Sequence, residues 1–411
     1  MTRILQTSGP REIIRIMQEI KVDAYGMRIM LPKAVSRLVR TDALPSFSAN
    51  ILKQEMLSLG GDAAISRNAL TGKDRLSVCL LMGTLAQYQS LSQKLRQQPF
   101  GLAQLAEELR RALKNYAREK FILELGRHRL NLGRRTHIMG IVNLTPDSFS
   151  GDGLLQAQSV KRKAQSLILE YAEKLVRDGA DIIDIGGESS RPGAKPVSAK
   201  EELKRVIPAI RIIAKKVRAP ISIDTRKPEV ARQALDNGAA MVNDITGLRY
   251  PEMIKAVKQN KAAVVIMHMK GNPRDMQVKP EYASLIDEIA GFLQGAIKRA
   301  EDSGINPDKI IVDPGIGFGK TLAHNLEILK RLGEFRSLGK PIMVGPSRKS
   351  FLGKILKCVP QERIFGTITS CILAAENGVK IVRAHDVKAV AEALKVFDAV
   401  NKAGRKQDVL I

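Results

Sequence analysis

Residues 181–187 read DIIDIGG, a short run rich in Ile that leads into the loop ESSRPGA (188–194) and then into a helical stretch. Seven similar runs share this pattern, and they are HIMGIVN (137–143), PISID (220–224), AMVND (240–244), AVVIMH (263–268), KIIVD (309–313), PIMVG (341–345) and KIVRAH (380–385). Nearly continuous Ile- and Val-rich runs are typical of parallel strands that are buried on both faces.

Amphipathic helical stretches lie between these runs. They are predicted at 160–178, 199–216, 227–237, 283–302, 362–377 and 387–399. Eight strand-then-helix units in about 275 residues match a (β/α)₈ TIM barrel in number and size. An open doubly wound sheet usually has fewer strands and carries a dinucleotide fingerprint that this sequence lacks. The sequence therefore predicts an α/β fold with a TIM barrel in residues 135–411.

Residues 1–134 lack this rhythm. Helices are predicted near 10–20, 33–40, 47–59, 85–98 and 103–119, with one strand at 75–82. We interpret this part as a smaller α-rich α+β domain of unknown role. The basic segment HRLNLGRRTH (128–137) is predicted to be the junction, so that residues 135–411 alone should hold the active site.

The charge balance points to anionic partners. The chain has 67 Lys and Arg against 42 Asp and Glu, a formal charge of +25, which favours phosphorylated metabolites or nucleic acid. Nucleic-acid binding is disfavoured because Trp is absent, aromatic residues make up 4%, and the basic residues are scattered. The sequence shows neither a secretory signal nor an apolar run that could span a bilayer. A cytoplasmic protein is expected.

Polar residues stand at the end of every predicted strand. They are Asn143, Glu188, Asp224, Asn243 with Asp244, His268, Asp313, Ser347–Arg348–Lys349, and Arg383 with His385. In a TIM barrel the carboxyl ends of the strands converge on one face, where the active site lies. Asp224 and Asp313 follow apolar runs, where a carboxylate is costly unless it is paired. A ligand with two adjacent N–H donors would pair with such a carboxylate.

Several loops fit an anionic substrate. GGESSRPGA (186–194) offers Ser190 and Arg191 for a phosphate, and NLTPDSFSGDG (143–153) could hold a hard cation through Asn143. DPGIGFGKT (313–321) is not a P-loop, because Pro314 stands where the first glycine is required. The pair His385–Asp386 could suggest a metal-dependent hydrolase, but no further histidine ligands accompany it.

Taken in order, these strings resemble the dihydropteroate synthase family. IMGIVNLTPDSFSGDG (138–153) and GADIIDIGGESSRPGA (179–194) are similar to its two signature blocks. MHMKGNPRDMQ (267–277), VGPSRKSFLG (344–353) and IVRAHD (381–386) are similar to later ones. The resemblance implies a transferase of folate biosynthesis that condenses (7,8-dihydropterin-6-yl)methyl diphosphate with 4-aminobenzoate. It also implies a (β/α)₈ barrel, Mg²⁺ as cofactor, inhibition by sulfonamides and a homodimer.

The resemblance assigns roles to matching positions. The pterin would be bound by Asp224, Asn243, Ile245, Met267, Asp313, Lys349 and Arg383. The diphosphate would be held by Asn143, Ser190, Arg191, Arg383 and His385, with Mg²⁺ at Asn143. The aminobenzoate pocket would be formed by Phe318, Ser347 and Lys349. Catalysis would involve Lys349, Asp313, Arg191 and Asp152. This sequence reads SFSGDG where SFSDGG is usual, so Asp152 is displaced by one residue, and Pro346 replaces a small or hydroxyl residue.

Three alternatives fit part of the pattern. A synthase that uses a ribosylated aminobenzene phosphate would share the pterin half of the site. A methyltetrahydrofolate methyltransferase has no diphosphate to hold, which Ser190, Arg191 and the SRKS string argue against. A regulatory or scaffolding protein with an inactive barrel would not need the complete set of polar strand ends.

Overall fold

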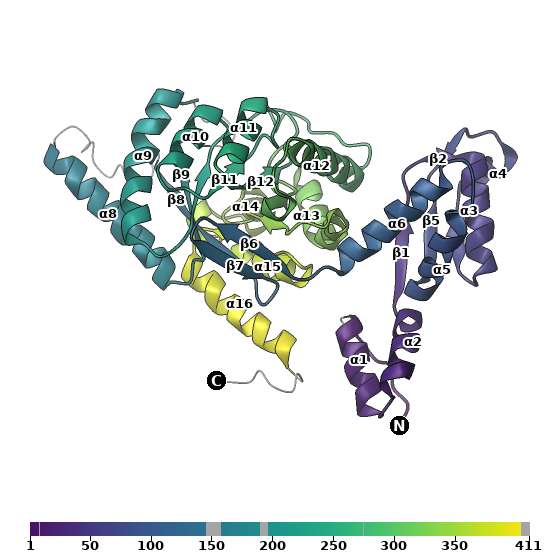
Figure 1. Cartoon of the computed structure of the whole chain (residues 1–411). Coiled ribbons are helices and arrows are strands. Elements are labelled where there is room, and N and C mark those ends of the chain that lie inside the picture. Colours follow the sequence, from purple (N-terminus) through teal and green to yellow (C-terminus); the bar gives the residue numbers. More distant parts are fainter. Residues whose placement is uncertain (8, 145–157, 190–195, 274, 404–411) are drawn as a thin grey trace. The chain divides into compact units, whose positions relative to one another are not determined.

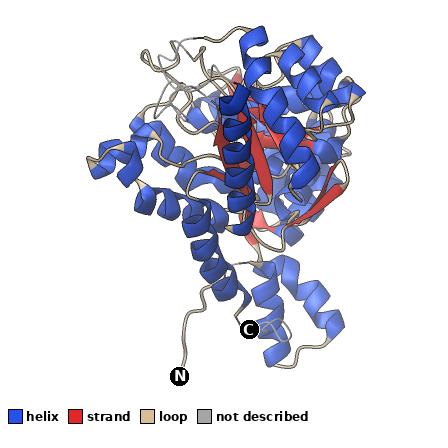
Figure 2. Ribbon diagram, turned by 90° about the vertical axis from the view of Figure 1, so that its left-hand side faces the viewer, coloured by secondary structure: helices blue, strands red, loops and turns tan. Residues whose placement is uncertain are grey.

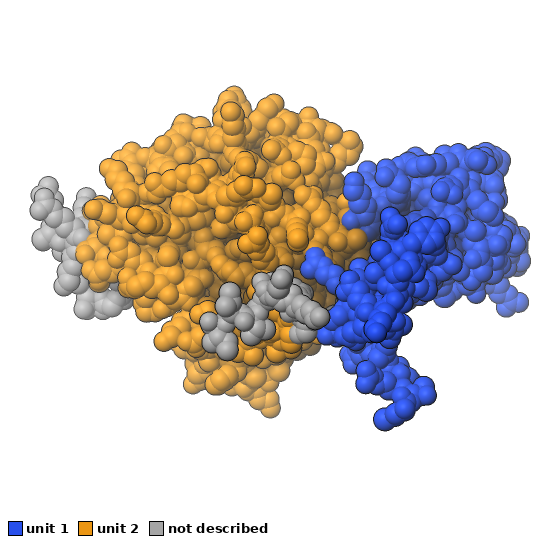
Figure 3. All heavy atoms as spheres, turned by 60° about the horizontal axis from the view of Figure 1, so that its bottom comes forward, with its two compact units in different colours: residues 1–114 blue, residues 115–411 orange. Residues whose placement is uncertain are grey.

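The computed structural model describes residues 1–7, 9–144, 158–189, 196–273 and 275–403. The chain divides into two units, Met1–Lys114 and Asn115–Ile411, which are coloured separately in Figure 3. None of the helices in these ranges is long and apolar enough to cross a bilayer.

The second unit is built around one parallel sheet. Its strands are β8 (His137–Asn143), β9 (Ile182–Gly186), β10 (Ile221–Asp224), β11 (Met241–Asp244), β12 (Ala263–Met267), β13 (Ile310–Asp313), β14 (Met343–Val344) and β15 (Ile381–Ala384). Within the described residues these eight strands follow the order β13-β12-β11-β10-β9-β8-β15-β14. A single parallel bridge, Val312 to Ile342, joins the two ends. The predicted eight-stranded barrel is thereby confirmed.

Helices surround the sheet (Figures 1 and 2). They are α8 (Gln158–Arg177), α9 (Ala199–Lys216), α10 (Pro228–Asp236), α11 (Pro251–Gln259), α12 (Leu285–Asp302), α13 (Leu322–Arg331), α14 (Ser350–Leu356), α15 (Ile364–Glu376) and α16 (Val387–Lys402). Their starts carry local signals. Ser198 caps α9 by accepting a hydrogen bond from the Glu201 N–H, and Pro occupies the first turn of α10 and α11.

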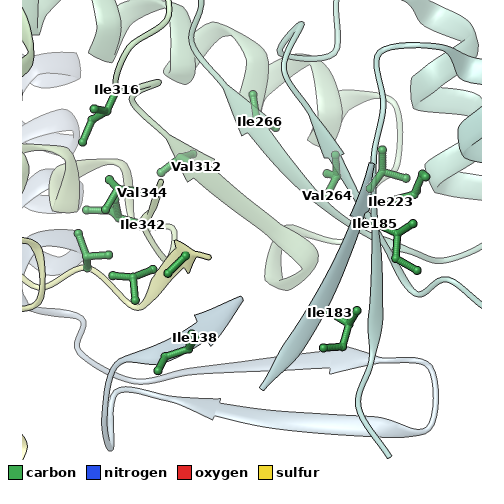
Figure 4. Packing of buried hydrophobic residues seen from close by; sticks show 14 of the residues in the cluster. Ile138, Ile183, Ile185, Ile223, Val264, Ile266, Val312, Ile316, Ile342 and Val344 are labelled. Carbon is green, nitrogen blue, oxygen red and sulfur yellow. The ribbon is translucent and has the colours of Figure 1, made fainter. Parts of the chain in front are cut away.

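Alternate residues of each strand face opposite sides of the barrel wall. One set includes Ile183, Ile223 and Val264 (Figure 4). It packs outward in a large cluster with residues of the helices. The other set faces the barrel axis. Near the amino ends of the strands this inner set is apolar except for Ser222 on β10. Its apolar members are Met139, Ile182, Met241, Ala263, Val265, Ile311, Met343 and Ile381.

A β-hairpin covers this apolar end of the barrel. Strands β6 (Phe121–Leu125) and β7 (His128–Leu132) pair antiparallel, and Gly126, with φ 59°, opens their two-residue turn. The side chains of Phe121, Leu123, Leu125 and Leu132 are buried in the same cluster as the inner apolar residues.

The predicted junction at 128–137 is therefore wrong. His128–Leu132 is a strand, and the hairpin belongs to the same unit as the barrel. The physical reason is that an eight-stranded barrel leaves apolar side chains exposed at its amino end, and the hairpin removes that surface from water.

The first unit is rich in helices, as predicted. Its elements are α1 (Pro10–Glu19), α2 (Ala24–Ala34), β1 (Ser36–Arg40), β2 (Leu44–Pro45), α3 (Ser46–Ser58), β3 (Asp62–Ala64), α4 (Arg67–Thr71), β4 (Leu76–Ser77), β5 (Leu80–Thr84), α5 (Leu85–Leu95) and α6 (Leu102–Ala117), which ends just inside the second unit. The predicted helix at 33–40 is wrong, because Ser36–Arg40 pairs antiparallel with β5. Leu52, Met56, Tyr88 and Leu91 form the centre of a separate core.

Candidate active site

The inner face of the barrel changes from apolar to polar along the strands. Toward their carboxyl ends the inward positions are Asp184 on β9, Asp224 on β10, Asn243 on β11, Asp313 on β13 and Arg383 on β15. Asp224 lies beside Asn243 in the strand register. The parallel sheet thus places carboxylates, an amide and a guanidinium in one layer, as the strand-end pattern predicted.

Arg383 is the centre of this layer. Its Nε donates to Asp184 Oδ2 at 2.6 Å, and its Nη2 donates to Asp224 Oδ2 at 2.7 Å. Asn243 Nδ2 donates to the same Asp184 oxygen at 3.3 Å. The structure therefore brings together the predicted residues Asp224, Asn243 and Arg383. Asp184, which sequence analysis did not single out, is their common partner.

Two buried acceptor oxygens of this layer lack a donor among the described residues, and so does the Ser222 hydroxyl beside Asp184 in the strand register. Asp184 Oδ1 and Asn243 Oδ1 have no hydrogen-bond partner in the described part of the chain. An unpaired buried acceptor is costly. A ligand that presents several N–H groups would remove this cost, so the layer suits a flat, donor-rich ring.

Burial also changes the acidity of the two strand-end aspartates. Burial raises the pKa of Asp224 to about 7, an effect that Arg383 opposes and that the neighbouring Asp184 carboxylate increases. Burial raises the pKa of Asp313 to about 6, although the Gly315 N–H and the cations Lys349 and Lys320 favour the carboxylate. Both carboxylates therefore gain or lose a proton near neutral pH. Asp313 Oδ1 accepts from the Gly315 N–H at 2.7 Å.

An apolar wall lies beside the polar layer. Phe318, which is 8% exposed, clusters with Ile245, Met267, Met269 and Met276. Ile245, Met267 and Phe318 were predicted, whereas Met269 and Met276 were not. Both lie in the string MHMKGNPRDMQ, where three methionines close together could have drawn attention.

Lys349 joins the two parts of the site. Its Nζ lies 4.0 Å from the centre of the Phe318 ring, which is a cation–π contact. It also contributes to the electrostatic environment of Asp313 and Asp224. Lys349 therefore lies against the apolar wall, and its charge acts on both carboxylates.

The loop that carries Lys349 is held tightly. The preceding residue, Arg348, has a left-handed backbone with φ 56°. Its guanidinium donates to both carboxylate oxygens of Asp386 at 3.0 and 2.5 Å, and its N–H donates to Thr367 Oγ1 at 3.1 Å. Non-glycine residues adopt this backbone only where the surroundings enforce it. These contacts supply that support.

Ser347 and His385 are brought together from β14 and β15. Ser347 Oγ and His385 Nδ1 are 3.1 Å apart, and the His385 N–H donates to the same hydroxyl at 3.2 Å. The family resemblance assigned these residues to the aminobenzoate pocket and the diphosphate site, respectively. Their contact makes the two predicted subsites adjacent.

A cavity of about 380 Å³ opens beside Asp224. Its lining residues are Glu188, Ser189, Pro196, Asp224, Thr225, Arg226, Ile245, Asn272, Pro273 and Asp275. Although burial opposes the shift, the hydrogen bonds from Arg226 and Lys227 lower the pKa of Glu188 to about 2. Glu188 therefore carries a charge at neutral pH and ties the β9 loop to the β10 loop.

Three predicted residues, Asp152, Ser190 and Arg191, lie outside the described residues. Asn143, the predicted metal ligand, ends β8 beside Gly186 in the strand register. A Cβ atom built on Gly186 would lie 3.7 Å from Asn143 Oδ1, in ordinary contact. Across the described residues, no group of three or more His, Cys, Asp or Glu side chains is placed to hold a metal.

Comparisons with known proteins agree with this geometry. Residues 139–385 match a family model described as pterin binding enzyme. A dihydropteroate synthase of Synechocystis sp. is 47% identical over 280 residues, which are 68% of this chain and 94% of that protein. A structure of Xanthomonas albilineans dihydropteroate synthase with 4-aminobenzoic acid is 41% identical, with a TM-score of 0.62, and it covers 69% of this chain and 98% of that one.

A further relative extends the similarity to the first unit. The probable bifunctional folylpolyglutamate synthase/dihydropteroate synthase of Halobacterium salinarum is 40% identical over 389 residues. These are 93% of this chain and 45% of that protein. An alignment of this length must include most of residues 1–114.

Proposed function

The chain belongs to the pterin binding enzyme family, and we infer from its site that the barrel acts as a dihydropteroate synthase. This transferase reaction joins a dihydropterin methyl diphosphate to 4-aminobenzoate and releases diphosphate. One observation carries the inference. A buried polar layer above the apolar part of the barrel is formed by Asp184, Asp224, Asn243, Asp313 and Arg383. Within the described residues, Asp184 Oδ1 and Asn243 Oδ1 of this layer have no hydrogen-bond donor.

We propose that this layer binds the pterin ring. The carboxylates of Asp224 and Asp313 would accept from its amino and ring N–H groups, since such paired contacts fix both position and orientation. Asn243 would bind the ring edge, and Lys349 would donate to its carbonyl. Arg383, whose edge is occupied by Asp184 and Asp224, would present its guanidinium face to the ring.

The aryl substrate would lie next to this ring. We propose that Phe318, Ser347 and Lys349 form the aminobenzoate pocket, because Lys349 lies over the Phe318 ring and Ser347 follows β14 in the same loop. The diphosphate would lie beside it, near His385, since His385 contacts Ser347. Its other proposed contacts are Asn143, Ser190, Arg191 and Arg383.

The proposed chemistry needs no protein nucleophile. The bond between the pterin methylene carbon and the diphosphate oxygen breaks first, and the electron pair leaves with the diphosphate. The arylamine nitrogen then bonds to that carbon and loses a proton. The residues contribute by holding the two reactants in contact and by stabilising the departing negative charge with cationic groups.

Mg²⁺ is the proposed cofactor. Mg²⁺ usually takes one or two protein oxygens and completes its shell with substrate phosphates and water, so the amide oxygen of Asn143 at the end of β8 fits a metal that arrives with diphosphate. Asp152 is the second proposed contact. When bound, the metal would neutralise charge on the leaving diphosphate.

We propose that the protein forms a homodimer through α14 and α15. Phe365 is 77% exposed, and Val359 is 55% exposed. Ile355, Leu356 and Leu373 are exposed on the same two helices. Helices α14 and α15 contact each other, and we propose that these side chains form one apolar surface, as is typical of an interface. Phe365→Asp should convert the protein to a monomer, which is tested by measuring its molar mass by light scattering. A molar mass equal to that of the wild-type protein would contradict this interface.

For the first unit, we propose a role in assembly or stability rather than in chemistry. The Synechocystis relative is a dihydropteroate synthase, although its match is confined to about two thirds of this chain. The full set of predicted site residues also lies after position 142.

A turnover assay tests the proposed reaction. The purified chain is incubated with the dihydropterin methyl diphosphate and 4-aminobenzoate, with Mg²⁺ or with a chelator, and dihydropteroate is measured by chromatography. A parallel reaction replaces 4-aminobenzoate by its ribosylated phosphate form. Product from 4-aminobenzoate is expected. Product from the ribosylated compound alone would contradict the proposed aryl substrate, and no product from either would contradict the proposed function.

A further inference from the structure

A lysine that none of the proposed roles uses is buried behind the site. Lys320 follows β13 and precedes α13, and it is 2% exposed. Its Nζ lies 2.9 Å from the Phe318 carbonyl oxygen and 3.0 Å from His268 Nδ1. None of the ion pairs found among the described residues includes it. Burying an ammonium group without a carboxylate beside it is costly.

The loop that Lys320 closes leaves little room for adjustment. Gly315, Gly317 and Gly319 all have positive φ values, of 72°, 83° and 64°. A Cβ atom at Gly315 would lie 1.9 Å from the His268 carbonyl oxygen. The loop after β13 is therefore pressed against the segment that follows β12.

Three successive carbonyl groups of this loop accept from side chains. Gln277 donates to the Gly317 oxygen at 2.8 Å, and Tyr282 donates to the Gly319 oxygen at 2.8 Å. Lys320 holds the carbonyl between them, that of Phe318. Among these three donors, Lys320 alone can carry a positive charge. The Phe318 ring in turn lies under the Lys349 ammonium.

The charge of Lys320 also acts on the carboxylate of Asp313 at the end of β13. The charged groups that act on Asp313 are Lys349, Lys320 and Arg383, and those that act on Lys320 are Asp313 and Lys349. Burial lowers the pKa of Lys320 to about 7, and Asp313 opposes this shift. His268 stays neutral because burial and Lys320 lower its pKa to about 2, so its Nδ1 can accept the lysine proton.

We propose that Lys320 is a positioning residue for the condensation. It fixes the Phe318 carbonyl, and with it the ring under Lys349, and in its protonated form it adds a positive charge to those of Lys349 and Arg383 that act on Asp313. The proposal rests on the proposed roles of Phe318 and Asp313. It differs from a purely structural role, in which any hydrogen-bond donor at this position would serve equally well.

Two substitutions separate these roles. Lys320→Met removes the charge and the donor, whereas Lys320→Gln removes the charge and keeps an N–H donor. Lys330→Met is the matched control, because Lys330 lies exposed on α13. In both Lys320 variants, the acid limb of kcat/KM for the pterin substrate should move upward by roughly one pH unit, because an opposite charge has been removed from Asp313. The KM for 4-aminobenzoate should rise roughly tenfold in Lys320→Met and less in Lys320→Gln, because only the second variant keeps a donor for the Phe318 carbonyl.

The outcomes can be told apart from a failure of the proposed function. Calorimetric titration of a pterin ligand at several pH values reports on Asp313 without turnover, so an inactive variant still tests the charge. Phe318→Ala tests the aminobenzoate pocket independently of Lys320. Suppose that Phe318→Ala raises the KM for 4-aminobenzoate. If both Lys320 variants then show the same acid limb of kcat/KM and the same KM for 4-aminobenzoate as the Lys330→Met control, Lys320 has no positioning role. If Lys320→Met does not fold, an unshifted acid limb in Lys320→Gln overturns the proposal.

Discussion

The hairpin β6–β7 should decide the stability of the barrel without touching its chemistry. Leu123 is 0% exposed and packs among the inner apolar residues of the strands. Its neighbour Ile122 points to the other face of the same strand and is 46% exposed. Truncation of a fully buried leucine to alanine costs about 2–5 kcal/mol, whereas a surface substitution usually changes stability by about 0.5 kcal/mol or less.

The expected difference is large on the scale of protein stability, which is about 5–15 kcal/mol. At about 2–4 °C per kcal/mol, Leu123→Ala should lower the Tm by roughly 4–20 °C, and Ile122→Ala should lower it by a few degrees at most. Calorimetry measures both. The kcat of Leu123→Ala at 25 °C should match the wild-type value, because the site lies at the carboxyl ends of the strands.

Truncations give the same test in another form. Removal of residues 1–114 should leave a folded, active barrel, whereas removal of 1–134 also deletes Phe121, Leu123, Leu125 and Leu132 from its apolar end. The second truncation should therefore be unstable. Equal melting temperatures for Leu123→Ala and Ile122→Ala, or for the two truncations, would refute the reasoning. A loss of more than about a hundredfold in kcat on removal of 1–114 alone, about 2.7 kcal/mol, would place part of the site in the first unit.

Three further predictions concern the site. Asp313→Asn and Lys349→Ala should each lower kcat/KM more than tenfold, about 1.4 kcal/mol, with an unchanged circular dichroism spectrum; retained activity in either would contradict its role. The pKa values of Asp313 and Asp224 are raised to about 6 and about 7. The value of kcat/KM for the pterin substrate should therefore fall as the pH drops from 7 to 5, because the carboxylates become protonated. A flat pH profile would exclude these carboxylates as hydrogen-bond acceptors for the pterin. Calorimetry should show weak binding of 4-aminobenzoate until pterin and diphosphate with Mg²⁺ are present, and sulfonamides should compete for this pocket, less well if Pro346 stiffens its rim; equally tight binding to the enzyme alone would contradict the order.

The sequence predicted the barrel well because its signal is local. Each buried parallel strand must be apolar on both faces, so HIMGIVN predicted the bounds of β8 as the structure has them. The polar strand ends were also visible, since Asp224 and Asp313 interrupt apolar runs. Parallel pairing then brings them to one end of the barrel without further information.

The parts that were missed depend on contacts between distant residues. Ser36–Arg40 was predicted as helix, but pairing with β5 overrides the local preference. The alternation of Phe121, Leu123 and Leu125 was a strand signal, yet only the open end of the barrel explains why a hairpin is needed there. Asp184 lies inside a strand, and the sequence does not show that its partner is Arg383. Lys320 lies inside a glycine-rich loop, and the sequence does not show that its partner is His268.

The closure of the barrel has a consequence for its motions. Strands β13 and β14 are joined by the single bridge between Val312 and Ile342, whereas β12 and β13 share a four-residue ladder. Amide exchange in native proteins proceeds through local openings, which occur first where few hydrogen bonds must break. Asp313 ends β13, and the loop with Lys349 follows β14. A ligand that contacts both residues would therefore link the two strands of the barrel that share a single bridge. Substrate binding would then slow proton exchange along β13 and β14 more than anywhere else in the wall.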